Sequence, residues 1–498
     1  MILQLVKIHR DNSGFRALNK NNDNKVLLQK SEIKKAPGRS YDDYEGQAPV
    51  DDWAKIETQL QILVLQIDKK INQLVNAIIH HPRFQELEAN WRGLYFLCSE
   101  RSLAKSARST KIKVLDISLA QLGKDLSRAI DFDQSEIFKK VYADEYDNPG
   151  GEPYSILLGC YRVRLKPRPE VGITDLEVLQ LMSGVAAAAF APFFCSVEPS
   201  FFGVDQYREL SPLMQVADMM KQSEYRAWNS LRESDDSRFI GVVLPDVLMR
   251  KQYQDDGSRC DGFVFKEQIN NTSDRLWGNA VFAFATTVMR AFSEYGWFAS
   301  IRGVTRGQIG GGVVTDLPVE LSPVDQATEI APLAVQITDS LEQQLHSNGF
   351  IPAMAIPRTP YIAFYGNNSL QRPPSYSDTV ATTNAAMSSM MQYTLCVSRF
   401  AHYIKVICRE KVGTFANESE CEDFLQQWLL KYTTANDDAS VELKAKYPLR
   451  EARVTVAERP DKPGYMLCDI HIRPHFQLDN LTSSIQLTTE IVQSKRGN

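Results

Sequence analysis

The chain has 498 residues, of which 43% are hydrophobic and 23% are charged, and its net charge at pH 7 is −5. This balance predicts an ordinary globular protein of about two to four domains, whose core is stable without metal ions or disulfide bonds. The slightly acidic charge offers no basic surface field, so we do not expect nucleic acid as a partner.

Cysteine spacing and apolar windows indicate the compartment. The eight cysteines lie at least 12 residues apart, which excludes a zinc-binding spacing and is typical of a reducing compartment. The two most apolar windows, 184–197 and 276–299, are interrupted by Pro192 and by polar residues such as Arg290. Neither offers the roughly 20 apolar residues of a membrane span, and the first residues lack a secretory signal pattern. We therefore expect a cytoplasmic protein without membrane insertion.

Residues 1–50 are polar and rich in Asn, Lys and Asp, apart from a short alternating stretch at residues 3–8. These residues contain too few apolar side chains to form a core, which predicts a flexible N-terminal arm. Such arms usually extend freely, but in an assembling protein an arm can instead bind a neighbouring subunit.

A helical segment is predicted for residues 51–105. Asp51 and Asp52 are suitable N-cap residues, and Pro82 ends the first helix. Between them, apolar residues recur at steps of three and four, close to a heptad repeat, and so form one stripe along the helix. This stripe needs another helix to cover it, either from within the chain or from a partner. We call its residues the seam: Ile56, Leu60, Leu63, Ile67, Ile71, Leu74 and Ile78.

Residues 106–355 are predicted to form a mixed α/β body. Alternating or continuous apolar runs of five to ten residues predict strands, and longer apolar stretches predict buried helices. The strands are expected at 111–117, 155–164 and 238–243, and the helices at 178–190 and 276–295.

Residues 356–498 are predicted to form a C-terminal domain. Two helices are expected at 381–409 and 420–432. Apolar residues then alternate with polar ones around 452–456, and again after a turn that contains proline and glycine. This pattern predicts a hairpin followed by one further strand near the end of the chain.

No short motif indicates catalysis. The glycine-rich stretch 302–318 lacks the G-K-[ST] ending of a phosphate-binding loop, so we interpret it as a tight turn; a phosphate site that uses Arg302 and Arg306 is the alternative. His471 and His475 are separated by a proline within a β pattern and do not converge on a metal ion. No nucleophile-elbow sequence is present. We therefore predict no catalytic residue, no cofactor and no metal, and do not expect an enzyme.

A series of motifs resembles the large sheath subunit of bacterial type VI secretion systems, the TssC/VipB family. The sequence LEANWRGL at 87–94 resembles the L-E-x-x-W-R-G-L signature of that family. Further motifs match in the same order over about residues 60–490, and this order is more specific than any single motif. They are RFIG to LP at 238–245, LWGNA at 276–280, YGW at 295–297, IRG, GGV and LP within 301–318, VSRFAHY at 397–403 and RPHFQ at 473–477.

The resemblance implies an α+β, or mixed α/β, multidomain fold of the contractile-tail-sheath type, with an N-terminal helical segment and C-terminal strands. It implies a structural protein of the bacterial cytoplasm that has no active site. Family members pair with a small sheath subunit of the TssB/VipA type and stack as hexameric rings into a helical tube. This sheath extends from a baseplate around an Hcp-like inner tube, contracts to propel it, and is disassembled by a ClpV-type AAA+ ATPase.

The resemblance also implies that terminal strands link neighbouring subunits. Strand addition lets rigid bodies turn while backbone hydrogen bonds persist. We therefore predict inter-subunit strands at 466–473 and 485–491, and we predict that the small subunit packs on the seam. The interface residues predicted on the two strands are Met466, Cys468, Ile470, Ile472, Ile485, Leu487 and Ile491.

Two other functions remain open at this point. A phage-tail-like contractile injection particle would share this architecture, although such systems normally build the sheath from one type of chain. The second alternative is a cytoplasmic enzyme that uses the glycine-rich stretch. A phosphate ligand that raises the melting temperature would identify it.

Overall fold

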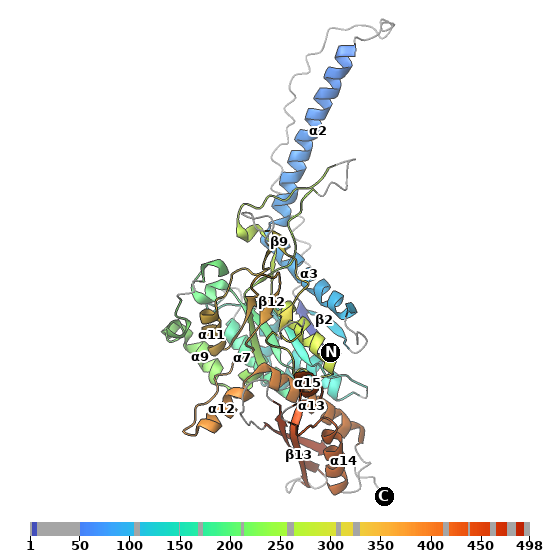
Figure 1. Ribbon diagram of the computed structural model, residues 1–498, viewed down its shortest axis with the longest axis vertical. Helices are drawn as coiled ribbons and strands as arrows, with labels where there is room; N and C mark the ends of the chain where they lie inside the picture. Colours follow the sequence, from blue (N-terminus) through green and yellow to red (C-terminus); the bar gives the residue numbers. More distant parts are fainter. Residues whose placement is uncertain are drawn as a thin grey trace. The chain divides into compact units, whose positions relative to one another are not determined.

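The computed structural model describes residues 2–6, 50–103, 110–148, 150–167, 173–210, 214–255, 263–304, 310–321, 329–411, 418–436, 439–458, 465–475 and 485–492. The chain divides into two compact units, and Figure 1 labels their elements. The larger unit contains Met1–Lys7, Glu88–Lys251 and Arg275–Asn498, and the smaller unit contains Ile8–Leu87 and Gln252–Asp274.

The larger unit is built on an eight-stranded sheet in the order β2-β1-β3-β4-β5-β11-β12-β8. Neighbouring strands from β2 to β11 run parallel, and β12 and β8 continue the sheet in antiparallel pairing. The three strands predicted for the body are confirmed as β2, β3 and β5. The strands are β1 (Ile2–Val6), β2 (Ile112–Asp116), β3 (Ile156–Val163), β4 (Phe193–Val197), β5 (Ile240–Leu244), β8 (Val313–Val314), β11 (Phe350–Ala355) and β12 (Ile362–Phe364).

Strand β1 lies inside this sheet and not in a free arm. Its backbone pairs with β2 on one side, with Ile2 opposite Ile112, and with β3 on the other, with Ile2 opposite Ile156. The prediction of a flexible arm is therefore wrong for residues 2–6. A short stretch of β-forming residues satisfies its backbone donors and acceptors on both sides when it lies between two strands. Residues 7–49 of the predicted arm lie outside the described residues.

Helices cover both faces of the sheet. Side chains alternate along β4, so that Phe193 belongs to a core with α4 and α7, whereas the ring of Phe194 lies 4.9 Å from that of Phe284 on α10. Burial on both faces explains why the strand sequences are continuous apolar runs. The buried helix predicted at 276–295 is confirmed as α10. The main helices are α4 (Leu119–Arg128), α7 (Asp175–Ala188), α9 (Arg226–Glu233), α10 (Val281–Tyr295) and α11 (Asp339–Ser347).

The single helix predicted at 381–409 is in fact two helices, α12 and α13. Between them, the carbonyl group of Ser389 and the N–H of Met391 are each hydrogen-bonded, at 2.8 Å, to the backbone of residues 367–369. These bonds replace the regular helical hydrogen bonds, so the helix is interrupted by a tertiary contact that local sequence does not encode. The two helices are α12 (Thr379–Ser388) and α13 (Met391–Lys411).

The C-terminal part packs α13 and α14 against a three-stranded antiparallel sheet, in which β14 lies between β13 and β15. Figure 1 shows α14 beside β13, and Gln426 of α14 accepts a hydrogen bond from the N–H of Val454 on β13 at 2.9 Å. The predicted hairpin and the further strand are both confirmed. The elements are α14 (Glu418–Leu430), α15 (Val441–Lys446), β13 (Leu449–Glu458), β14 (Tyr465–Pro474) and β15 (Ile485–Val492).

The smaller unit contains the long helix α2 (Val50–Ile79), the start of α3 (Pro82–Leu103) and the segment Gln252–Asp274. The boundaries of α2 agree with the predicted start at Asp51 and the predicted stop before Pro82, within the usual one or two residues. The helical segment predicted from the sequence therefore consists of two successive helices.

Candidate subunit interface

The seam is exposed along the length of α2. Its seven side chains retain between 36% (Ile71) and 61% (Leu74) of their accessible surface, far more than core residues of these types normally keep. No residue within the described ranges covers this stripe, so the interpretation of an internal partner has no support there. A continuous exposed apolar stripe on a helix is the usual mark of a helix-binding surface.

The seam occupies one face of α2. At about 100° per residue, its side chains fall within a sector of roughly 80° around the helix axis. Trp53 and Val64, which are also exposed, extend this sector to roughly 100°, the width of the apolar stripe on a typical amphipathic helix. The polar residues Gln61 and Gln73 lie outside the sector, and so do the exposed apolar residues Ile62 and Leu65. This geometry fits one or more partner helices that lie along α2.

Strand β14 does not present the interface that the sequence predicts. The side chains of Cys468, Ile470 and Ile472 are fully buried in the core of the C-terminal part, against residues of α13 and α14 such as Phe400. Both edges of β14 are paired, one with β13 and one with β15. The interface role expected for these three residues is therefore corrected to a core role, because the alternation marks the face that packs on the helices.

Strand β15 forms one edge of the same sheet. Its backbone pairs with β14 from Val492 opposite Tyr465 to Ile485 opposite Ile472. Within the described part of the chain, no strand pairs with its other edge. The side chains of four predicted interface residues are not among the described ones, so only their backbone places are known and their interface role stays a prediction. They are Met466, Ile485, Leu487 and Ile491.

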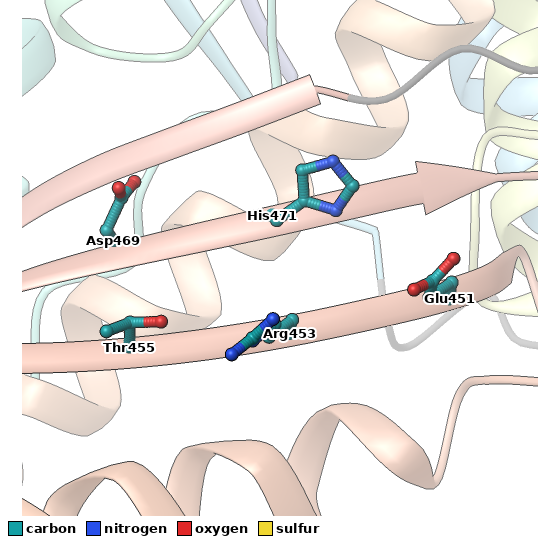
Figure 2. A pocket seen from close by; sticks show the side chains of 5 residues that line it. All are labelled: Glu451, Arg453, Thr455, Asp469 and His471. Atoms are coloured by element: carbon teal, nitrogen blue, oxygen red, sulfur yellow. The ribbon is translucent and has the colours of Figure 1, made fainter.

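The opposite face of this sheet carries a polar hollow with a volume of about 370 Å³ (Figure 2). Figure 2 shows its side chains on two neighbouring strands, with Arg453 opposite His471 in the strand register. Glu451 forms an ion pair with Arg473 at 3.5 Å. Charges of both signs gather on this face, which suits a polar protein contact. The lining residues are Glu451, Arg453, Thr455, Asp469 and His471.

The described part of the glycine-rich stretch is a tightly packed turn. Gly311 has a left-handed φ of 60°, and a Cβ atom on Gly312 would lie 2.3 Å from the carbonyl oxygen of Phe364. Nη1 of Arg302 lies 3.8 Å from the sulfur of Met390. The middle of the stretch, which holds the other candidate arginine, lies outside the described residues. These contacts favour the tight turn over the phosphate site.

Sequence reasoning missed a row of basic side chains on α13 that contact aromatic rings and carbonyl groups. Nζ of Lys405 lies between 4.8 and 5.2 Å from three ring centroids, and burial lowers its pKa to about 8. Arg409 donates hydrogen bonds to three backbone carbonyl oxygens. His402 lies 3.1 Å from the carbonyl oxygen of Ala189, and burial lowers its pKa to about 3. The row attaches α13 to the rest of the larger unit, through partners that no sequence motif reveals.

Over the described ranges, no three or more His, Cys, Asp or Glu side chains gather in a way that could hold a metal ion. In the same residues, no helix combines the length and the apolar character that crossing a bilayer requires. His475, one of the two histidines considered as metal ligands, lies 2.7 Å from the carbonyl oxygen of Thr434.

Family models match nearly the whole described chain. The EvpB/VC_A0108 tail sheath N-terminal domain matches residues 61–371, and the EvpB/VC_A0108 tail sheath gpW/gp25-like domain matches residues 380–491. The chain therefore belongs to this family of tail sheath proteins, also called VipB. The predicted family and the α+β fold class are confirmed.

A particular relative is the type VI secretion system sheath protein TssC1 of Pseudomonas aeruginosa. It is 37% identical over 443 residues, which cover 88% of this chain and 86% of the relative. A solved structure, the sheath tail protein from Desulfitobacterium hafniense, is 7% identical with a TM-score of 0.30 and covers 64% of this chain and 62% of its own.

Proposed function

We propose that this chain is the large, non-enzymatic subunit of a type VI secretion sheath in the bacterial cytoplasm, and that it pairs with a small TssB/VipA-like subunit through the seam. The exposed apolar stripe on α2 is the observation that carries this proposal. A structural subunit of a tail sheath must present surfaces to partners, and the seam is a continuous apolar surface of that kind in the described chain.

The seam is large enough to hold a partner helix. Full burial of a Leu or Ile side chain contributes about 1.5–3 kcal/mol, and each seam residue is roughly half exposed. Covering all seven would contribute on the order of 5–10 kcal/mol, before the entropy lost on association is subtracted. Such a balance suits a stable pair of subunits.

Strand β15 is the proposed link between copies of the chain. Among the described strands it pairs with β14 alone, and the ten residues that connect it to the end of β14 include Asp479, Asn480 and two serines. An edge strand can leave its own sheet and occupy the same place in a neighbour without changing the number of backbone hydrogen bonds. Exchange of this kind would join copies into hexameric rings and a helical tube.

The remaining parts of the proposal follow from family membership. The tube would extend from a baseplate, surround an Hcp-like inner tube and propel it by contraction. A ClpV-type AAA+ ATPase would disassemble the contracted form. No cofactor and no nucleic acid takes part in this scheme.

The test is a single charge on the seam. Leu63→Asp is expected to abolish co-purification with the small subunit, because a carboxylate would be buried in an apolar helix contact. The far-UV circular dichroism of the chain should stay unchanged, since Leu63 is about half exposed. Gln61→Asp, about 200° around the helix from Leu63, is the matched control and should co-purify normally. Co-elution of Leu63→Asp at the wild-type ratio would refute the proposed pairing.

A further inference from the structure

A long hairpin connection reaches helix α2. Strands β6 (Val247–Leu248) and β7 (Trp277–Gly278) pair in the larger unit, with Val247 opposite Gly278. Their connection includes Gln252–Asp274, which belongs to the same compact unit as α2. We call the described residues of this connection, 252–255 and 263–274, the strap. Both ends of the strap are therefore connected to the paired strands β6 and β7.

Two asparagines of α2 bind the backbone of the strap. Asn72 makes two hydrogen bonds to Lys266: its Nδ2 donates to the carbonyl oxygen and its Oδ1 accepts from the N–H, each at 2.9 Å. One turn later, Oδ1 of Asn76 accepts from the N–H of Gln268 at 2.9 Å. Nδ2 of Asn76 donates to the carbonyl oxygen of Asn72 at 2.9 Å, which fixes its orientation. The two amide side chains thus hold the strap much as a neighbouring β-strand would.

A third contact to the strap follows those of the two asparagines. Nε2 of His80 lies 3.0 Å from Oε1 of Glu267, whose side chain is fully buried. The other carboxylate oxygen of Glu267 accepts a hydrogen bond from the N–H of Tyr253 at 2.9 Å. Three successive strap residues, 266 to 268, are therefore each bound by one of three residues spaced four apart: Asn72 and Asn76 of α2, and His80, which directly follows the helix.

The residues that bind the strap lie on the opposite side of the helix axis from the seam. Asn72, Asn76 and His80 centre about 180° around the axis from the middle of the seam, at about 100° per residue. A partner helix on the seam and the strap can therefore bind α2 at the same time. The strap also prevents α2 from rotating about its own axis, because a rotation of one residue would break all three contacts.

The identity of the side chains matters for this contact. An asparagine amide has both a donor and an acceptor, and both are used at position 72. Aspartate has the same shape but cannot donate, and it would place a negative charge against the carbonyl oxygen of Lys266. The apolar periodicity of α2 does not predict a contact for these asparagines, since polar residues outside the apolar stripe normally face water.

We propose that Asn72, Asn76 and His80 are positioning residues, which lock α2 on the strap in one rotational setting so that the seam meets the small subunit in the single direction that sheath assembly requires. This inference rests on the proposed function. It adds that pairing needs only the seam, whereas polymerisation also needs the strap contact.

The test uses the full chain co-expressed with the small subunit. The double variant Asn72→Asp and Asn76→Asp keeps side-chain shape and leaves the seam intact. Each aspartate can still accept from the strap, but it loses the bond that Nδ2 donated and repels the carbonyl oxygen that it then faces, of Lys266 at position 72 and of Asn72 at position 76. Hydrogen exchange of peptides within 263–274 should become about tenfold faster, because this repulsion separates the strap from α2 and exposes the amides of Lys266 and Gln268. The two subunits should still co-purify, but negative-stain images should show few or no full-length tubes.

The matched control is Gln66→Glu with Gln73→Glu, which adds the same charge at exposed positions of α2 outside the seam. It should keep both the exchange rates and the tubes of the wild type.

A merely structural strap would give faster exchange with normal tubes, and that result would overturn the inference, as would unchanged exchange. Loss of co-purification in the asparagine variant would also overturn it. If the double variant does not fold, Asn72→Asp alone is judged by the same readouts. Failure of the proposed function is recognised separately, by normal co-purification of Leu63→Asp.

Discussion

Replacing Gly93 with alanine is expected to destabilise the larger unit although it improves the helix. Gly93 lies within α3, where alanine is favoured over glycine by about 1 kcal/mol. A Cβ atom at this position would lie 2.3 to 2.6 Å from three carbons of the Phe282 ring, and that ring is fully buried. Overpacking of a core typically costs about 1–3 kcal/mol. The net loss in the free energy of unfolding is therefore up to about 2 kcal/mol.

A double-mutant cycle distinguishes this reasoning from a general intolerance of Gly93. Urea unfolding would give the free energy of unfolding for the wild type, Gly93→Ala, Phe282→Ala and the double variant. Phe282→Ala alone should cost about 3–5 kcal/mol. In that background the new methyl group has room, so Gly93→Ala should become neutral or stabilising. An equal loss in both backgrounds, or no loss while Phe282 is present, would refute the close contact as the reason for this glycine.

Two further predictions concern buried residues of the C-terminal part. Ile470→Asp should unfold that part of the chain without any partner present, because the side chain is fully buried; protease resistance equal to the wild type together with lost polymerisation would restore the interface role instead. Because burial lowers the pKa of His402 to about 3, the unfolded chain takes up a proton near pH 6.5 while the folded chain does not. Stability should therefore fall as the pH drops from about 6.5 towards 3, and His402→Gln should flatten this slope in pH-dependent melting. An unchanged slope would contradict the buried neutral imidazole.

The periodic part of the fold was predictable from sequence. The seam and the boundaries of α2 follow from three- and four-residue steps and from Pro82, and they depend on local geometry alone. The C-terminal strands were found for the same reason, because side chains alternate with a period of two. The alternation does not reveal whether the apolar face is covered by helices of the same chain or by another subunit. The helices of the same chain cover it at Ile470, so the predicted interface proved to be core.

Tertiary hydrogen bonds explain the other differences. The break between α12 and α13 occurs where the backbone of Met391 bonds to a distant loop. Strand β1 is placed by two strands that follow it by more than 100 residues. Asn72 and Asn76 resemble ordinary surface residues until the strap is seen beside them. No sequence window contains both partners of these contacts.

The central claim is that the seam of α2 is covered by the small subunit in the assembled sheath. Maleimide labelling tests it directly, with a cysteine at Ile67 on the seam or at Gln61 off it, in a chain whose exposed Cys98 and whose Cys260 are replaced by serine. In the isolated chain both positions should react rapidly. In co-expressed sheaths, Ile67→Cys should be protected while Gln61→Cys remains at least partly reactive. Equal reactivity of Ile67→Cys in the free and assembled forms would contradict the claim.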